Sequence, residues 1–174
     1  PAVDMEGYEA DDLIATYAKQ AHARGMKVTV VSSDKDLMQL VRPGIEMYDP
    51  MRNRIIGFAE VVEKFGVGPD KVVEVQALAG DSVDNVPGVP GIGVKTAAQL
   101  IIEYGDLDTL LERAGEIKQP KRRENLIEHA EMARVSRRLV QLRDDVDVPT
   151  SIDDMAVRDA DNDTVLAFLK EQGF

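Results

Sequence analysis

A short run of β-branched residues behind an amphipathic helix restricts the fold of this chain more than any other feature. Residues 27–32 read KVTVVS, an almost continuous apolar run of the kind found in buried parallel strands. Residues 9–24 carry apolar side chains at helical spacing, and Gly25 ends that pattern. This order predicts an α/β fold with a parallel-type sheet flanked by helices. The remaining short elements predicted here are strands at 45–48 and 54–56 and a helix at 58–65.

The pattern changes after Gly66, where helices replace strands. Pro69 opens a helix that runs to Leu78, and a stretch rich in Gly and Pro follows. Further helices are predicted at 95–104, 107–113, 120–142 and 161–172. We therefore predict three regions. They are an α/β part at 1–66, a helical part with a helix-hairpin-helix at 67–142, and a C-terminal part at 143–174 whose extended segment and helix pack back.

Acidic residues gather in three segments, at the start of a helix (7–12), just after the strand (33–36) and between two helices (80–85). Each segment has an ordinary structural explanation, because acidic groups favour helix starts and cap helices and loops. Ligands of α/β sheets, however, lie beyond the carboxyl ends of strands. The candidate metal ligands are Glu9, Asp11, Asp12, Asp34, Asp36, Asp81 and Asp84. The candidate catalytic residues are Asp12, Asp34 and Asp36.

Carboxylates gathered in this way would repel one another and raise one another's pKa. Divalent cations would remove the repulsion. Because the chain has no cysteine and its two histidines, His22 and His129, stand alone in predicted helices, oxygen ligation favours Mg²⁺ or Mn²⁺ over Zn²⁺. Two such ions about 4 Å apart stabilise the attacking and leaving oxygens in phosphodiester hydrolysis.

The charge is distributed unevenly. The net charge of −11 argues against a protein that simply coats DNA, yet residues 117–143 carry eight Lys or Arg against three Glu. A solvated helix face is the simpler explanation. The alternative is a protein that holds metal ions at one place and a polyanion at another. No apolar run reaches the roughly 18 residues of a membrane span, so no membrane contact is expected.

A glycine-rich hairpin, PGVPGIGVKTA, occupies residues 87–97. The P-loop pattern fails because Val94 separates Gly93 from Lys95, and the dinucleotide pattern fails at Thr96. A Gly-Ile-Gly turn before a helix start can grip a phosphate without reading sequence, although a tight helical connection is the alternative. The candidate DNA-binding residues are Gly91, Ile92, Gly93, Val94, Lys95 and Thr96.

At these residues the chain resembles the 5′ nuclease domain of bacterial DNA polymerase I, in the flap endonuclease family. The segments 7–12, 33–37 and 80–97 match the motifs of that family in order, and the similarity covers nearly all of the chain. The resemblance implies a PIN-like, flap endonuclease fold that is incomplete here, followed by a helix-hairpin-helix (H2TH) subdomain. It also implies that the seven acidic residues form the metal site, that the hairpin holds duplex DNA and that its turn can bind K⁺.

The implied activity is that of a structure-specific 5′-3′ exonuclease or flap endonuclease in primer removal during DNA replication and in DNA repair. It implies a two-metal-ion mechanism. The implied partners are 5′ flaps, nicks and duplex ends of DNA without sequence preference, and a polymerase region that follows. The implied location is the bacterial cytoplasm, in association with the nucleoid.

The chain departs from the family at its start, because members carry further residues before the segment at 7–12. Those residues supply the first strand, two more metal-site aspartates and a basic arch. The chain begins at Pro1, so we expect a fragment with an unpaired strand edge that needs the missing N-terminal part or self-associates. Alone, it would be a weak nuclease or none. Two other functions stay open: a non-catalytic helix-hairpin-helix DNA-binding module, and a phosphotransfer or glycosyl-transfer enzyme using Asp34 and Asp36.

Overall fold

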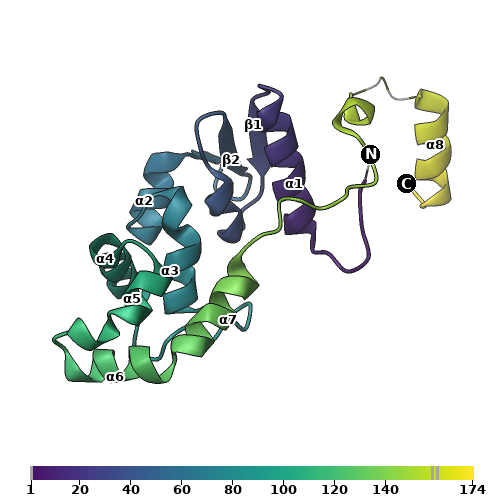
Figure 1. The fold of residues 1–174 in the computed structure, drawn as a ribbon. Helices are drawn as coiled ribbons and strands as arrows, with labels where there is room; N and C mark the ends of the chain where they lie inside the picture. Colours follow the sequence, from purple (N-terminus) through teal and green to yellow (C-terminus); the bar gives the residue numbers. More distant parts are fainter. Residues whose placement is uncertain (1, 158, 160) are drawn as a thin grey trace.

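The computed structural model describes residues 2–157, 159 and 161–174 (Figure 1). Pro1, Arg158 and Ala160, which belong to the first and third predicted regions, lie outside the described residues. A small sheet with α1 and α2 beside it forms one half of the molecule, and a group of helices forms the other. The predicted order of an α/β portion and a helical portion is therefore confirmed.

Helix α1 (Ala10–Ala23) is the helix predicted in front of the strand. At its N-terminus the carboxylate of Asp12 accepts a hydrogen bond from the backbone N–H of Glu9 (3.4 Å). Gly25, with φ of 76°, ends the helix in the left-handed conformation that glycine adopts without strain. The buried face of α1 consists of Leu13, Ala15, Thr16 and Ala18.

Three strands form the sheet in the order β1 (Val28–Val31), β2 (Ile45–Asp49) and β3 (Arg54–Ile56). β1 and β2 are parallel, with Val28 opposite Ile45, whereas β2 and β3 are antiparallel. Among the described residues β1 pairs on one side only, and Val31 is 64% exposed. The expectation of an unpaired edge is confirmed, and the expectation of a fully buried strand is wrong because β1 is that edge.

The helical half is built around α3 (Val72–Ala79), which follows α2 (Phe58–Phe65) and a 3-10 turn, η2 (Pro69–Lys71). Helices α4 (Val94–Tyr104) and α7 (Ala130–Val140) pack against α3. The elements that complete this half are α5 (Leu107–Glu112), η3 (Ala114–Glu116) and α6 (Pro120–Glu128).

The single helix predicted at 120–142 is wrong, because α6 and α7 are separate helices. They meet at His129, whose φ of −110° and ψ of 21° leave the helical region. Neither Gly nor Pro follows Pro120 in this segment, so local propensity gives no sign of the break. The cause is packing, since α6 lies against η3 whereas α7 lies against α3 and α5.

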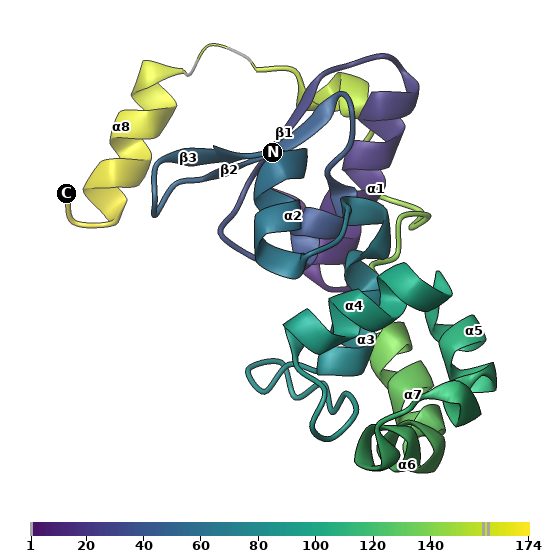
Figure 2. The same cartoon turned by 90° about the vertical axis from the view of Figure 1, so that its left-hand side faces the viewer.

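The C-terminal region contains η4 (Ile152–Met155) and α8 (Asn162–Glu171). The segment before η4 packs back on α1, where the buried Val146 donates its N–H to the Thr16 hydroxyl (3.2 Å). α8 differs from the expectation that the closing helix packs back. It has no buried residue, and it stands apart from the body in Figures 1 and 2.

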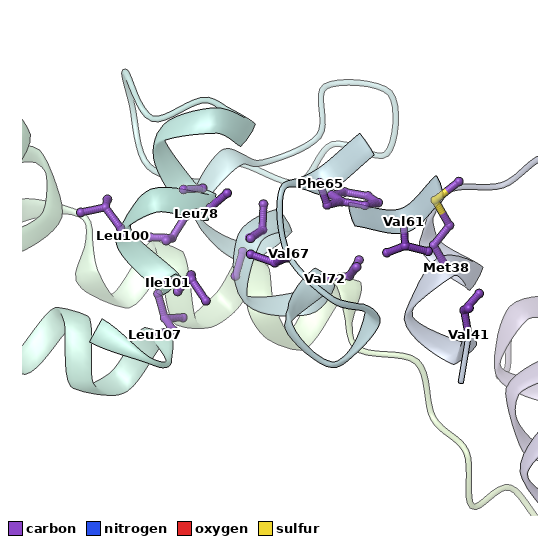
Figure 3. Close-up of a cluster of buried hydrophobic side chains, with 14 of the residues drawn as sticks. Met38, Val41, Val61, Phe65, Val67, Val72, Leu78, Leu100, Ile101 and Leu107 are labelled. Atoms are coloured by element: carbon purple, nitrogen blue, oxygen red, sulfur yellow. The ribbon is translucent and has the colours of Figure 1, made fainter. Parts of the chain in front are cut away.

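One hydrophobic cluster runs from the sheet into the helical half, and Figure 3 shows the part of it that lies beyond the sheet. It includes Met38 after the first strand, Val61 and Phe65 of α2, and Leu78 and Ile101 of the helical half. Because interiors are close-packed, this shared core holds the end of β1 and the loop after α3 in a fixed relation. Within the described residues no helix is both long and apolar enough to cross a membrane.

Candidate functional site

The segment after β1 presents two aspartates in a tightly hydrogen-bonded loop. The Ser32 hydroxyl accepts from the N–H of Asp34 (3.0 Å), and the Asp34 carboxylate accepts from the N–H of Asp36 (2.9 Å). Asp36 opens the 3-10 helix η1 (Asp36–Leu40), and Asp34 holds the first N–H of that helix from two residues upstream. The Asp36 carboxylate accepts from Nε2 of Gln76 on α3 (2.5 Å). A structural role and a ligand role are therefore compatible for Asp34, because it holds the turn with one carboxylate oxygen only.

The loop after α3 presents Asp81 and Asp84. The backbone of Asp81 pairs with Val86 in both directions (2.8 and 2.7 Å), which closes the loop. Gly80 has φ of 71°, and a Cβ at this position would lie 2.7 Å from the Val86 carbonyl oxygen. Asp81 also accepts from the N–H of Val83 (2.8 Å). Only glycine at position 80 allows this closed turn, which fixes the direction of the two carboxylates.

Lys35 joins the strand-end segment to the loop after α3. Its ammonium forms an ion pair with Asp81 and lies 3.3 Å from Asp84 and 3.8 Å from Asp36. Burial alone would lower the pKa of Lys35, but the hydrogen bond to Asp81 and the charges of Asp36 and Asp81 outweigh it and raise that pKa. The same hydrogen bond is the main reason why the pKa of Asp81 is lowered.

The start of α1 meets the strand-end segment electrostatically. Burial, followed by the charges of Asp34, Asp36, Glu9 and Asp12, raises the pKa of Asp11 from 3.8 to about 6. For Asp36, burial outweighs the contributions of Gln76 and Lys35 and raises the pKa. Asp34 and Asp84 add to this rise. The charges of the three acidic segments therefore act on one another, as expected if they lie on one side of the molecule.

The convergence is looser than a closed ligand shell. Among the described residues, no group of three or more His, Cys, Asp or Glu side chains is placed to hold one metal ion. Asp12 binds backbone groups, because its carboxylate accepts from the N–H of Glu9 and from the N–H of Arg143 (2.9 Å). Glu9 and Asp34 are exposed, whereas Asp11 and Asp36 are half-buried. The assignment of the seven residues as metal ligands thus stays a prediction.

The hairpin between α3 and α4 packs against the protein on one side and is exposed to solvent on the other. Gly88 lies against the backbone of Gly80, with φ of 61°, and its N–H donates to the Ser136 hydroxyl on α7 (3.0 Å). Ile92 is only 4% exposed, so this candidate DNA-binding side chain belongs to the core and can offer only its backbone. The other candidates are accessible, with Gly91, Gly93, Val94 and Lys95 exposed and Thr96 half-buried.

The turn of the hairpin ends in an open helix start. Gly93 is the N-cap of α4, and the first helical hydrogen bond runs from the N–H of Ala97 to the Gly93 carbonyl (2.9 Å). The amides of the first helical turn therefore precede the hydrogen-bonded part of the helix and can meet an anion. Asn125 on α6 braces the turn, because its Nδ2 donates to the Pro90 carbonyl (2.7 Å).

Two arginines of the basic segment at 117–143 already form ion pairs within the chain. Arg137 lies 2.8 Å from Asp108, and Arg134 is paired with both Asp108 and Glu131. These arginines stabilise the contact between α5 and α7. Lys118 and Arg122 instead line a hollow between α4 and α6. The local excess of positive charge counted from the sequence therefore overstates the charge that α7 can offer to a polyanion.

Three residues of this region were not singled out from the sequence: Lys35, Gln76 and Asn125. For Lys35, its position between two aspartates was the only feature of the sequence that could have indicated a role in the site. Gln76 and Asn125 reach partners 40 and 35 positions away, so nothing local in the sequence indicates their roles.

Two family models match the chain. Residues 67–163 match a 5′-3′ exonuclease C-terminal SAM fold, and residues 1–66 match a 5′-3′ exonuclease N-terminal resolvase-like domain. DNA polymerase I of Rhizobium leguminosarum is 58% identical over 100% of this chain and 17% of its own length. A 5′-3′ exonuclease of Aquifex aeolicus is 35% identical over 98% of this chain and 58% of its own length. The chain therefore spans less than two thirds of either relative.

A solved structure of the bacteriophage T5 flap endonuclease, in a pseudo-enzyme-product complex with DNA and metal ions, has the same fold. The TM-score is 0.74 at 25% identity, over 80% of this chain and 52% of that chain. The similarity includes both halves described above, since it extends over most of the chain.

Proposed function

Because this chain belongs to the 5′-3′ exonuclease family of the DNA polymerase I type, we propose that it forms part of a structure-specific nuclease. That nuclease hydrolyses DNA phosphodiester bonds near 5′ ends, in primer removal and repair. The observation that carries the proposal is that acidic residues from separate segments lie close together. Lys35 lies 3.8 Å from Asp36 and 3.3 Å from Asp84, and the charges of Asp34 and Asp36 add to burial in raising the pKa of Asp11. Carboxylates placed in this way remain together at a cost that a bound cation relieves.

The cations proposed for this site are two Mg²⁺ or Mn²⁺ ions. The donors suit them, because Asp11, Asp34 and Asp36 offer only oxygen. Mg²⁺ keeps several waters and uses one or two carboxylates, so an ion here does not need three protein ligands in one shell. A buried oxygen of Gln76 without a hydrogen-bond partner in the described part of the chain also suits a bound ion or its water. Gln76 is 3% exposed, and its Oε1 has no hydrogen-bond partner among the described residues. When bound, the two ions would stabilise the attacking and leaving oxygens.

Two neighbouring residues hold the proposed metal ligands in place. Asp12 holds the backbone of Glu9 and of Arg143, which fixes the start of α1 and so the direction of Asp11. Gln76 holds Asp36 against α3. We therefore assign Asp11, Asp34 and Asp36 to one ion and Asp81 and Asp84 to the other. Asp12 is treated as a residue that positions Asp11.

The proposed DNA contact is the hairpin. Gly91 and Gly93 leave the backbone accessible, and Lys95 adds an exposed positive charge at the start of α4. Contacts of this kind go to phosphates and carry no sequence preference. A K⁺ ion bound by carbonyl oxygens of the turn belongs to the same proposal. Asn125 already uses the Pro90 carbonyl, which leaves other carbonyls of the turn for such an ion.

The wider setting is proposed from the relatives. The T5 structure holds DNA and metal ions, and the Rhizobium relative is a DNA polymerase I. We propose that DNA with 5′ flaps, nicks or duplex ends is the substrate, that a polymerase region belongs to the same protein, and that it acts in the bacterial cytoplasm at the nucleoid. This chain covers 58% of the Aquifex exonuclease, and we propose that full activity also needs residues from the rest of that length.

Two titrations of the 174-residue chain test the proposal. Mn²⁺ binding is measured by calorimetry, and binding to a nicked duplex is measured by fluorescence anisotropy in EDTA. Asp34→Ala should weaken Mn²⁺ binding at least about tenfold, because it removes ligand oxygens, and should leave duplex binding unchanged. Asp147→Ala, at an exposed aspartate remote in sequence, is the control. If Asp34→Ala takes up Mn²⁺ as the wild type does, the metal assignment is wrong.

A non-catalytic DNA-binding module is the second candidate. It is favoured by the loose geometry of the acidic residues and by the ion pairs that Lys35 makes with them. Duplex binding by a wild-type chain that takes up no Mn²⁺ would support this candidate over the nuclease.

A further inference from the structure

Lys35 stands where its charge serves the acidic residues as an internal cation. Its ammonium pairs with Asp81 and lies 3.3 Å from Asp84 and 3.8 Å from Asp36. The three carboxylates come from two segments that are far apart in the sequence. No other Lys or Arg among the described residues forms an ion pair with any of the three.

The ammonium is held there from both sides. The backbone around Lys35 is fixed, because Ser32 and Asp34 cap the loop that carries it. Asp81 is 9% exposed and is held by the N–H of Val83 (2.8 Å). The Lys35 side chain is 29% exposed, so it can still leave the carboxylates by turning toward solvent.

The other end of the acidic region has no such partner. Asp11 and Asp34 form no ion pair among the described residues. The two ends of the site therefore differ: one is already neutralised by an ammonium, and the other carries uncompensated negative charge.

We propose that Lys35 is a built-in counter-ion that a divalent cation must displace from Asp81 and Asp84. The inference rests on the proposed metal site and adds the order in which its two ions bind. A first ion binds at the Asp11 and Asp34 end, and a second ion binds more weakly at the Asp81 and Asp84 end. Without metal, Lys35 stabilises the apo chain. With metal, it limits the affinity of the second ion.

The test compares Lys35→Met with the wild-type chain by Mn²⁺ calorimetry and by the electron paramagnetic resonance signal of free Mn²⁺. Neither reading depends on nuclease activity. Methionine keeps an unbranched apolar stem one atom shorter than lysine and removes the charge. The weaker Mn²⁺ affinity should rise roughly three- to tenfold, as expected when one competing ion pair is removed. Lys35→Arg keeps the charge and should keep the wild-type affinity.

The matched control is Lys19→Met, because Lys19 forms an exposed ion pair with Asp144 (2.9 Å) and pairs with none of the seven acidic residues. It should leave Mn²⁺ binding unchanged. In EDTA the melting temperature of Lys35→Met should fall below that of the wild type, and saturating Mn²⁺ should raise it by more than it raises the wild type. Lys35→Gln is the second variant, for use if Lys35→Met does not fold.

Each outcome has a different meaning. An equal or lower affinity of the weaker site in the charge-free variants overturns the role of Lys35, while the proposed metal site stands. A lack of Mn²⁺ binding in both the wild type and the variants overturns the role of Lys35 and the metal site together.

Discussion

Replacing Asp11 with asparagine is expected to stabilise the metal-free chain at neutral pH. Asp11 lies at the start of α1, and burial and four neighbouring carboxylates raise its pKa from 3.8 to about 6. Each pH unit of such a difference corresponds to about 1.4 kcal/mol, which sets an upper limit of about 3 kcal/mol. Asp11 is only half-buried and solvent screens its charge, so we expect roughly 1 kcal/mol.

The pH dependence gives the prediction its sign. The folded chain holds the Asp11 proton more tightly than the unfolded chain does, so ionisation opposes folding. Below about pH 4 the group is protonated in both states and costs nothing. The cost grows as the pH rises from about 4 to about 6 and is constant above that. Asparagine, which cannot ionise, avoids this cost.

The assay is urea unfolding of wild type and Asp11→Asn in EDTA at several pH values, followed by circular dichroism. The variant should gain stability at pH 7.5 and no stability at pH 3.5. Asp147→Asn, at an exposed site, should change stability little at either pH. A variant that gains nothing at pH 7.5 would refute the crowding of carboxylates around Asp11, on which the metal site depends.

Two further changes test the hairpin. Gly88→Ala should destabilise the chain by about 2–4 kcal/mol in urea unfolding, because φ is 61° and the added Cβ would lie 2.7 Å from backbone atoms of Ala79 and Gly80. The control is Gly93→Ala, where nothing lies within 4 Å of the added Cβ. Equal losses of stability in the two variants would contradict the close packing of Gly88 against Gly80. Asn125→Ala should weaken binding to a nicked duplex about fivefold in anisotropy measurements, because the Pro90 carbonyl loses its 2.7 Å brace; a variant that binds as the wild type does would show that the turn holds its shape unaided.

Local patterns in the sequence were sufficient for the elements that pack through regular faces. The apolar spacing before Gly25 predicted α1, and the β-branched run predicted β1 with its parallel partner. The residues 58–65 were predicted as a helix with the bounds that α2 has. In these elements the local preference and the final packing agree, so the sequence pattern is informative.

Other features depend on contacts that a local pattern does not contain. The break at His129 arises from packing of α6 and α7 on different neighbours, and no Gly or Pro marks it. Ile92 lies in a turn of exposed residues yet fills the core. α8 has the amphipathic pattern of a docked helix and no buried residue. In each case tertiary contacts, or their absence, decide the outcome.

The acidic site shows the same division. The residue types and their positions at a strand end, a helix start and a loop predicted that the carboxylates interact, and the raised pKa of Asp11 agrees with this. The pairing of Lys35 with Asp81, 46 positions away, was not predictable, because a lysine between two aspartates is equally compatible with a solvated side chain. The distinction requires the folded loop after α3.

The most direct test of the account is anomalous X-ray diffraction from crystals of this chain soaked in Mn²⁺. The account predicts a manganese peak next to the carboxylates of Asp11, Asp34 and Asp36, with a weaker second peak on the side of Asp81. Manganese bound only elsewhere on the molecule, or no peak at saturating Mn²⁺, would contradict it.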